Sequence, residues 1–558
     1  MKKILVLTIL FLIPQIVSAD YQGQRVNFFV DKNYDLSGRD QIQATLIYIT
    51  PKIYFYLEDS WWNSLEESQK QEILNSLSSL SSEFENKIYP TLTSVFGSEW
   101  KPGIDSDPHI TVLFHQLKKE AGGYFNSGDE YPRVQYPSSN EREMVYLNTE
   151  YITGSQAKIF LAHEFMHLVT FNQKERLFDV QEDVWLNEAR SEYVSTLLDY
   201  DSVYEGSNLQ RRIREFLGKP TDSLTEWQGK PQDYGVLNLF TQYLIDHYGA
   251  KILVDSLKMR KTGIESLEEA LKQNGFQENF SQVFTNWTIA VLANDCSLGE
   301  RYCYKNESLR RFQVIPTTNF LPLVGKSSLQ VTKFTKNWAG NWEKIIGGKG
   351  NLKLEFEGSP AVNFKVFYIA EDSDGKILVN FLQLDSFQKG AVTISDFGSK
   401  NLSLTIIPSI QKKISGFGNN EPSSYYSFKV SILEAEETPS SEEQKHIQEL
   451  LTQIEFLKAE ILRIQIKLAE LQGKTAPLAC QSFSQDLYYG MMNSPTVSCL
   501  QEFLKSKGQG VYSEGIVSGN YLSLTALAVK RYQALKGISQ TGYFGPLTRT
   551  AANADLGL

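Results

Sequence analysis

The sequence predicts a multidomain α+β protein, and three observations support this class. The chain has 558 residues, more than a single domain usually holds. Apolar residues recur at helical spacing between residues 153 and 315, after a stretch from residue 20 to 152 that mixes strands with one helix. Between residues 321 and 433 apolar residues alternate at period two between turn residues, which is typical of a β-sandwich.

Residues 1–19 have the composition of a secretory signal peptide. Two lysines precede an apolar run from Ile4 to Ile13, and Val17-Ser18-Ala19 supplies a small-residue cleavage site. We therefore expect an exported bacterial protein, secreted or associated with the cell envelope. No other apolar run in the sequence is long enough to span a bilayer, and the net charge of −10 argues against a nucleic-acid partner.

The region from residue 20 to 152 is predicted to form the strand-rich part of the first domain. The expected helix covers Ser68 to Ile88. Strands are expected at four β-branched and aromatic segments: Val26–Val30, Thr45–Tyr56, His109–Phe114 and Met144–Leu147. Asp105 and Asp107, in the turn at residues 102–108, could help to bind Ca²⁺, although aspartates beside glycine and proline also form turns without a metal.

Two histidines one helical turn apart mark the candidate site. His163 and His167 lie at positions i and i+4 of an apolar helix expected over residues 156–171, so both imidazoles can reach one metal ion. Glu164 is rotated by about 100° from His163 around the helix axis, which favours contact with a metal-bound water over metal binding. This H-E-x-x-H pattern is typical of zinc sites.

A second helix, expected over residues 183–200, supplies the missing ligand. Tetrahedral zinc with two histidines and a water needs one more protein ligand. Glu188 and Glu192 lie one turn apart on one face of this helix. We expect Glu188 to bind the metal and Glu192 to accept a hydrogen bond from a ligand imidazole.

The pattern A-H-E-F-x-H-L followed by W-L-N-E-x-x-S resembles the gluzincin zinc metallopeptidases, in the thermolysin-type group and more closely in its hyicolysin-like branch. The resemblance implies a zincin-type domain, one Zn²⁺ per chain, and an endopeptidase that acts on protein or peptide substrates. It also implies that a strand upstream of the zinc helix, here Met144–Leu147, pairs with the substrate backbone. Tyr234 and His247 are the candidates for stabilising the oxyanion, although either residue could serve only in packing.

The four cysteines are expected to form two structural disulfides, because the protein is predicted to be exported. Proximity in the sequence favours Cys296 with Cys303 and Cys480 with Cys499.

Residues 434–446 have the composition of a linker, and residues 447–473 that of a coiled-coil helix. Apolar residues step by three and four along this helix: Ile447, Leu450, Ile454, Leu457, Ile461, Ile464, Leu468 and Leu471. The pattern fits a homodimer through a coiled coil, but also a lone amphipathic spacer.

Residues 477–558 resemble the peptidoglycan-binding domain 1 family, whose members are small three-helix modules. The matching residues are Val497, Leu500, Gln501, Leu504, Gly515, Val517, Gly519, Thr525, Ala528, Val529, Tyr532, Gln533 and the run Thr541 to Thr548. The resemblance implies peptidoglycan as a partner. The sequence thus predicts a zinc endopeptidase held at the cell wall, with a peptidoglycan-cleaving zinc hydrolase or an inactive wall-bound scaffold as alternatives.

Overall fold

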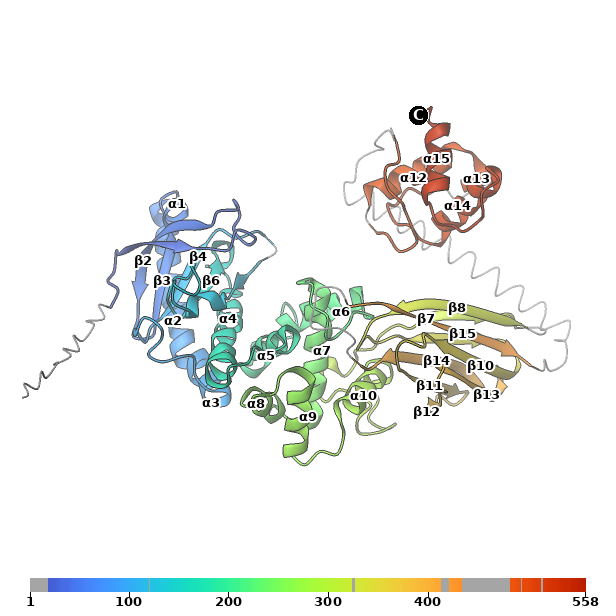
Figure 1. The fold of residues 1–558 in the computed structure, drawn as a ribbon, viewed down its shortest axis with the longest axis horizontal. Coiled ribbons are helices and arrows are strands. Elements are labelled where there is room, and N and C mark those ends of the chain that lie inside the picture. The colour runs from blue at the N-terminus through green and yellow to red at the C-terminus, as the bar shows by residue number, and fades with distance from the viewer. Residues whose placement is uncertain are drawn as a thin grey trace, which may run out of the picture. The chain divides into compact units, whose positions relative to one another are not determined.

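The computed structural model describes residues 19–119, 121–323, 327–412, 421–433, 482–492, 494–512 and 515–557. The described residues form two compact units, one within residues 1–438 and one within residues 439–558 (Figure 1). Separate buried clusters of apolar side chains lie in the two units. An α+β architecture of several parts, with a sheet-rich region and a helical C-terminal module, confirms the coarse prediction. No helix within these described ranges is long and apolar enough to cross a membrane.

Four predictions fall wholly or partly on residues outside the described ranges. They are the signal peptide at residues 1–19, the linker at 434–446, the coiled-coil helix at 447–473 and its homodimer, and the disulfide that involves Cys480.

A mixed six-stranded sheet opens the first unit, in the order β1-β2-β3-β4-β6-β5. Its strands are β1 (Arg25–Phe29), β2 (Gln41–Ile49), β3 (Ile53–Glu58), β4 (Ile110–His115), β5 (Gly123–Tyr124) and β6 (Met144–Asn148). Strands β3, β4 and β6 run parallel, and every residue in them is buried because side chains pack on both faces of the sheet. The single strand expected at Thr45–Tyr56 is wrong: β2 and β3 form an antiparallel hairpin that turns at residues 50–52.

Helices pack on one face of this sheet. They are α1 (Asp59–Trp62), α2 (Glu67–Glu83) and α3 (Tyr89–Phe96), with a π-helical turn at Phe84–Ile88 between the last two. Phe55 of β3, Leu77 of α2 and Phe165 of α4 (Ala157–Phe171) belong to one buried cluster. The predicted helix at Ser68–Ile88 is present as α2 and the π-helical turn, and α3 follows this turn without a break.

The helical part of the first unit continues from α4 without a second sheet. Its helices are α5 (Val184–Leu197), α6 (Asn208–Gly218), α7 (Pro231–Tyr248), α8 (Lys251–Leu257), α9 (Gly263–Gln273) and α10 (Phe280–Ala293). Helices α6 and α7 approach closely at Gly235, where an added Cβ atom would lie 2.5 Å from the backbone nitrogen of Phe216. Glycine is therefore required at residue 235 for this helix pair to pack as it does.

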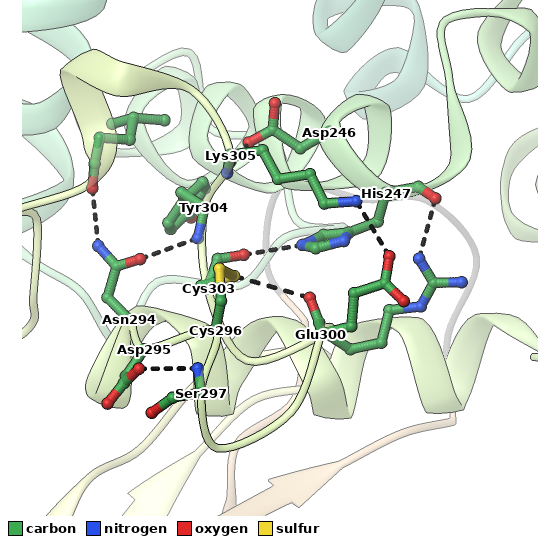
Figure 2. The surroundings of a disulfide bond; sticks show 12 residues. Asp246, His247, Asn294, Asp295, Cys296, Ser297, Glu300, Cys303, Tyr304 and Lys305 are labelled. Carbon is green, nitrogen blue, oxygen red and sulfur yellow. Dashed lines mark hydrogen bonds and ion pairs between the residues drawn. A yellow bond between two sulfur atoms is a disulfide. The ribbon is translucent and has the colours of Figure 1, made fainter.

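The loop after α10 carries a disulfide between Cys296 and Cys303, which confirms the first predicted pair (Figure 2). The Nε2 atom of His247, at the end of α7, lies 2.7 Å from the backbone oxygen of Cys303. The same loop is fixed at Asn294, whose side chain accepts a hydrogen bond from the backbone nitrogen of Tyr304. These contacts anchor the loop to the helical core.

Nine strands form the sheet-rich region, which begins at Thr317. They are β7 (Thr317–Leu321), β8 (Ser328–Thr335), β9 (Glu343–Gly347), β10 (Gly350–Gly358), β11 (Phe364–Asp372), β12 (Ile377–Leu382), β13 (Lys389–Phe397), β14 (Asn401–Ile410) and β15 (Ser424–Ile432). β13 and β14 pair only at Phe397 and Asn401. Residues of β10 and β15 share one core with residues of β11 and β14. The strands on either side of the single β13–β14 pair therefore pack against each other. Ile369 and Ile407 instead join the core of the helical part.

The second unit is a small helical module. It contains α12 (Pro495–Ser506), α13 (Gln509–Tyr512), α14 (Ser523–Leu535) and α15 (Pro546–Asp555). Two buried glutamines explain several residues of its sequence pattern. Gln501 accepts hydrogen bonds from the backbone nitrogens of Ser518 and Gly519, and Gln533 accepts one from that of Gly542. Each side chain thus fixes a glycine-containing loop ahead of the next helix.

Candidate metal centre

Helices α4 and α5 bring the three predicted ligands together. His163 and His167 project from one face of α4 and Glu188 from α5, and one donor atom from each residue lies within 4.8 Å of the others. The Nε2 atoms of His163 and His167 lie 3.2 and 3.7 Å from Oε2 of Glu188. His167 and Glu188, which are 21 positions apart in the sequence, thus lie in one cluster with His163.

The donor set of this cluster fits a zinc ion. Two imidazoles and one carboxylate are ligands that zinc takes in catalytic sites, where a fourth position stays open. The Oε2 atom of Glu188 is shielded from solvent and accepts no hydrogen bond of good geometry, although it faces both imidazole nitrogens. A buried carboxylate oxygen without a donor is costly, and a cation would compensate it.

The charged groups of the cluster shift one another's pKa values. Burial disfavours the charged form of His163, but the contact with Glu188 and the charges of Glu164, Glu188 and Glu192 outweigh it and raise the pKa of His163 to about 9. Burial lowers the pKa of His167. Burial also opposes the charge of Glu188, but the two histidines hold the pKa of this carboxyl below its usual range. The site therefore favours an ionised Glu188.

The second nitrogen of each imidazole also has a partner. Nδ1 of His167 lies 3.0 Å from Oδ1 of Asn187 and 3.2 Å from Oγ of Ser191. Nδ1 of His163 lies 3.4 Å from Oε1 of Glu192, where the sequence analysis places this carboxylate. Such contacts orient a ligand imidazole and leave its Nε2 atom available.

Glu164 lies beside the cluster and is buried. Burial raises the pKa of its carboxyl to about 8; the charge of His163 lowers it, and the charges of Glu188 and Glu192 raise it. Strand β5 approaches it closely, since a Cβ atom added to Gly123 would lie 3.1 Å from Cγ of Glu164. The side chain of the candidate general base therefore extends from α4 to β5 at the edge of the sheet.

Tyr234 lies near the cluster and His247 lies elsewhere. The ring centroid of Tyr234 is 6.5 Å from that of His163, and the charge of Glu188 adds to burial in raising the pKa of the Tyr234 phenol. His247 instead contacts the carbonyl of Cys303 in the disulfide loop (Figure 2). Of the two candidate oxyanion donors, the structure places only Tyr234 by the histidines.

The aspartates considered for Ca²⁺ make contacts typical of a turn. Oδ1 of Asp105 accepts a hydrogen bond from the backbone nitrogen of Asp107, and Oδ1 of Asp107 accepts one from the backbone nitrogen of His109. Oδ2 of Asp107 accepts a third from the hydroxyl of Tyr54. Within the described residues, neither belongs to a group of three possible metal ligands.

Residues that the sequence analysis missed also surround the site. Burial and the charges of Glu164 and Glu188 raise the pKa of the Tyr34 phenol. Its ring stacks on Tyr124 of β5 at a centroid distance of 4.8 Å. No local pattern in the sequence marks Tyr34, because its neighbours in the site come from distant segments.

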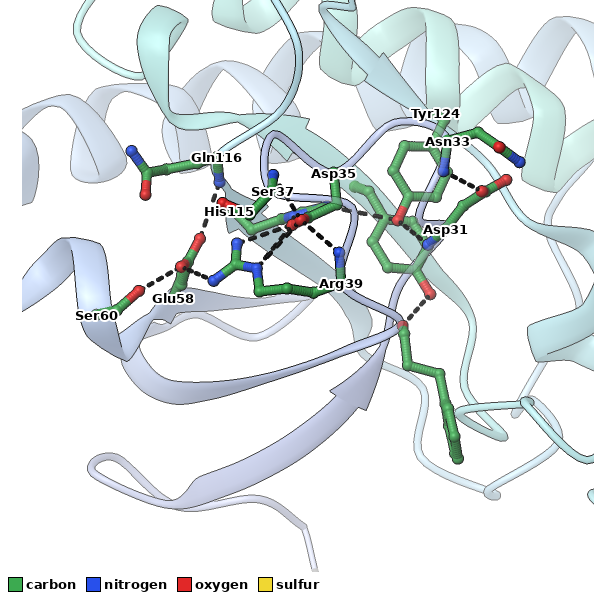
Figure 3. A network of polar contacts seen from close by, with 12 residues as sticks. Asp31, Asn33, Asp35, Ser37, Arg39, Glu58, Ser60, His115, Gln116 and Tyr124 are labelled. Atoms are coloured by element: carbon green, nitrogen blue, oxygen red, sulfur yellow. Dashed lines mark hydrogen bonds and ion pairs between the residues drawn. The ribbon is translucent and has the colours of Figure 1, made fainter.

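Polar contacts fix the loop that carries Tyr34 (Figure 3). The guanidinium of Arg39 bridges two buried carboxylates, with Nη2 2.7 Å from Oδ2 of Asp35 and Nη1 2.6 Å from Oε1 of Glu58. Nδ1 of buried His115 lies 3.4 Å from Oδ2 of Asp35. The loop is thus joined to the ends of β3 and β4, and His115 has a structural partner.

Comparison with known proteins identifies the C-terminal module. Residues 493–552 match the family of peptidoglycan binding domains. The chain therefore carries a peptidoglycan-binding domain, which supports association with the cell wall and peptidoglycan as a partner. No curated protein matches the chain.

Similar solved structures include three small proteins or domains. A mitogen from Yersinia pseudotuberculosis is 10% identical, with a TM-score of 0.14, and the match covers 20% of this chain and 89% of the mitogen. A periplasmic inhibitor of g-type lysozyme from Aeromonas hydrophila is 16% identical, with a TM-score of 0.15 and coverage of 21% and 98%. The pre-peptidase C-terminal domain of a Bacillus anthracis collagenase is 7% identical, with a TM-score of 0.14 and coverage of 21% and 96%. None of these likenesses assigns a function to the chain.

Proposed function

We propose that this protein is an exported zinc-dependent endopeptidase that its C-terminal module holds at the cell wall. One observation carries the proposal: His163, His167 and Glu188 converge on a single point, and buried Glu164 lies next to them. Glu188 Oε2, without a hydrogen bond, supports a cation at that point. The resemblance to gluzincin peptidases adds the expected reaction, hydrolysis of a peptide bond.

The residues of the chain have separate roles in this reaction. His163, His167 and Glu188 would hold the zinc ion, which supplies the Lewis acidity that polarises a peptide carbonyl and makes a water molecule more acidic. The Glu164 carboxylate accepts a proton from the attacking water and then delivers it to the leaving nitrogen. Tyr234 is the candidate donor to the oxygen that becomes negative.

Strand β5 is the best candidate for binding the substrate backbone. From the sequence, this role was expected at Met144–Leu147, but β6 lies between β4 and β5, and Gly123 and Tyr124 of β5 pair with Leu147 and Tyr146 on its outer side. The corrected candidate is the edge strand β5, at Gly123 and Tyr124, whose glycine lies against Glu164. A peptide that added a strand there would bring its carbonyls to the candidate base.

The peptidoglycan-binding domain also favours a second function. A hydrolase that cuts peptide bonds of the cell wall would use the same zinc site and would need the same module for access. A wall-bound scaffold without activity is less well supported, because Glu164 and all three ligands are present together.

Digestion of two substrates separates these functions. We expect the purified full-length chain to cleave casein and to leave purified sacculi intact. Release of soluble fragments from sacculi without cleavage of casein would support the wall hydrolase. Cleavage of neither substrate by protein loaded with zinc would contradict both, and the Glu164→Gln variant provides the inactive control.

A further inference from the structure

Arg212 of α6 makes a planar contact with the carboxylate that faces His163. Its Nε atom donates to Oε2 of Glu192 at 2.7 Å, and its Nη2 atom donates to Oε1 at 2.5 Å. Its third nitrogen, Nη1, donates to Oε2 of Glu215 at 2.7 Å. Two parallel hydrogen bonds from one guanidinium fix the plane of the carboxylate as well as its position.

Two asparagines complete the surroundings of Glu192. Nδ2 of Asn208, also on α6, donates to Oε2 of Glu192 at 3.0 Å, and Nδ2 of Asn238 on α7 lies 3.5 Å from the same oxygen. Oε1 is then the oxygen that faces Nδ1 of His163, at 3.4 Å. The carboxylate that faces His163 is therefore held in place by donors from α6 and α7.

The same guanidinium contacts the candidate oxyanion donor. Its central carbon lies 4.3 Å from the ring centroid of Tyr234, in a cation–π contact. The ring of Trp227 packs edge-on against Tyr234 with a centroid distance of 4.8 Å. Tyr234 thus contacts both Arg212 and Trp227, and its ring centroid lies 6.5 Å from that of His163.

The close packing of α6 on α7 explains how Arg212 reaches both partners. Gly235 follows Tyr234 directly, and an added Cβ atom there would meet the backbone of Phe216, one turn after Arg212. Because no side chain separates the two helices at this point, Arg212 is brought against Tyr234 while its guanidinium still reaches α5. Arg212 is buried, so solvent does not compete for these contacts.

We propose that Arg212 is a positioning residue of the metal centre. It holds Glu192 against Nδ1 of His163, and this contact directs Nε2 of His163 to the metal. It also holds the ring of Tyr234 beside the same histidine. This inference rests on the proposed zinc site. Arg212 does not touch the substrate or the metal in this role. A lysine cannot replace it fully, since one ammonium group cannot donate to both carboxylate oxygens in a plane.

Zinc affinity of full-length variants, measured by competition with a chelator, tests the proposal. We expect Arg212→Met to weaken zinc binding by about 10- to 100-fold, the usual effect of losing a partner that orients a ligand. Arg212→Lys should fall between this variant and the wild type. The matched control is Arg214→Met, which removes the same charge from an exposed position of the same helix.

A second readout separates positioning from general stability. The visible absorption bands of the Co²⁺-loaded protein report the geometry of the ligands, and we expect them to change in Arg212→Met and not in Arg214→Met. Thermal unfolding of the zinc-free variants checks that they fold. If Arg212→Met does not fold, Arg212→Lys decides the question.

The possible results have distinct meanings. Zinc affinity and Co²⁺ bands of a folded Arg212 variant that match the wild type would overturn the inference and leave the zinc site intact. A wild-type chain that binds no zinc would instead contradict the proposed function, and this inference with it. Weaker binding with changed bands, confined to the Arg212 variants, would support it.

Discussion

Gly123 lies against Glu164 so closely that a Cβ atom at residue 123 would be 3.1 Å from Cγ of the glutamate. The same Cβ atom would be 2.6 Å from the backbone oxygen of Tyr146, so glycine is needed for β5 to pair here. The contact places the candidate base directly beside the edge strand of the sheet. In the proposed function, a peptide bound along that edge lies beside the candidate base, which leads to the first prediction.

Glu164→Gln should lower kcat for peptide hydrolysis by on the order of 10²- to 10⁴-fold, the usual contribution of a general base. The amide keeps the shape of the side chain but cannot accept the proton of the attacking water. Zinc content should not change, because the substitution removes no ligand. Steady-state kinetics with a peptide substrate give the answer, and a loss of less than about tenfold with zinc retained would rule out Glu164 as the base.

The second prediction concerns the C-terminal module. A chain that lacks residues 477–558 should no longer sediment with purified sacculi, because the peptidoglycan-binding domain lies in this segment. It should still cleave a soluble peptide at the rate of the full-length protein, since the candidate site lies wholly in the first unit. Full-length Glu164→Gln protein is the control and should sediment normally. Equal sedimentation of the truncated chain would show that another surface binds the wall.

A buried pair of carboxyl groups should make stability depend on pH. Burial raises the pKa of Glu143 to about 7, and burial together with the charge of Glu143 raises that of Glu130 well above its usual range. Both oxygens of Glu130 and one of Glu143 are buried without a hydrogen-bond donor. The folded protein therefore keeps protons that the unfolded chain releases at its ordinary pKa of 4.5. Stability should fall as the pH rises from about 4.5 through about 7.

Glu143→Gln should weaken this dependence, because residue 143 then has no proton to lose and its charge no longer raises the pKa of Glu130. The variant should melt at a higher temperature than the wild type at about pH 8 and at a similar temperature at about pH 5. Its amide oxygen can still accept the hydrogen bond that Glu143 Oε1 accepts from the backbone nitrogen of Ile104. The control is Glu150→Gln at an exposed position. A wild-type melting temperature that rises across this pH range would contradict the assignment.

The sequence was most informative where the site depends on local geometry. His163 and His167 could be recognised because helical spacing alone places them on one face, and Glu188 and Glu192 for the same reason. Cys296 and Cys303 were paired correctly because only seven positions separate them. In each case the residues that act together lie within one or two helical turns or one short loop.

The other residues of the site come together through tertiary packing, which no local sequence pattern predicts. Arg212 meets Glu192 only because α6 packs on α7, which in turn packs on α5, and Tyr34 reaches β5 from a loop fixed by Asp35 and Arg39. The turn at residues 50–52 escaped notice because apolar and aromatic residues continue on both sides of it. The sequence pointed to β6 as the strand that pairs with substrate, but the structure has β5 at the edge of the sheet. The order of strands in a sheet cannot be inferred from the sequence of either strand alone.

Metal analysis of the purified mature protein tests the central claim most directly. We predict about one zinc ion per chain, retained in His109→Ala, reduced in Glu188→Ala and lost in the double variant His163→Ala, His167→Ala. His109 is a fair control, because its ring stacks on Tyr54 at 4.1 Å and belongs to no described group of three possible metal ligands. A full zinc complement in the double variant, or none in the wild type, would contradict the assignment of His163, His167 and Glu188 as a zinc site.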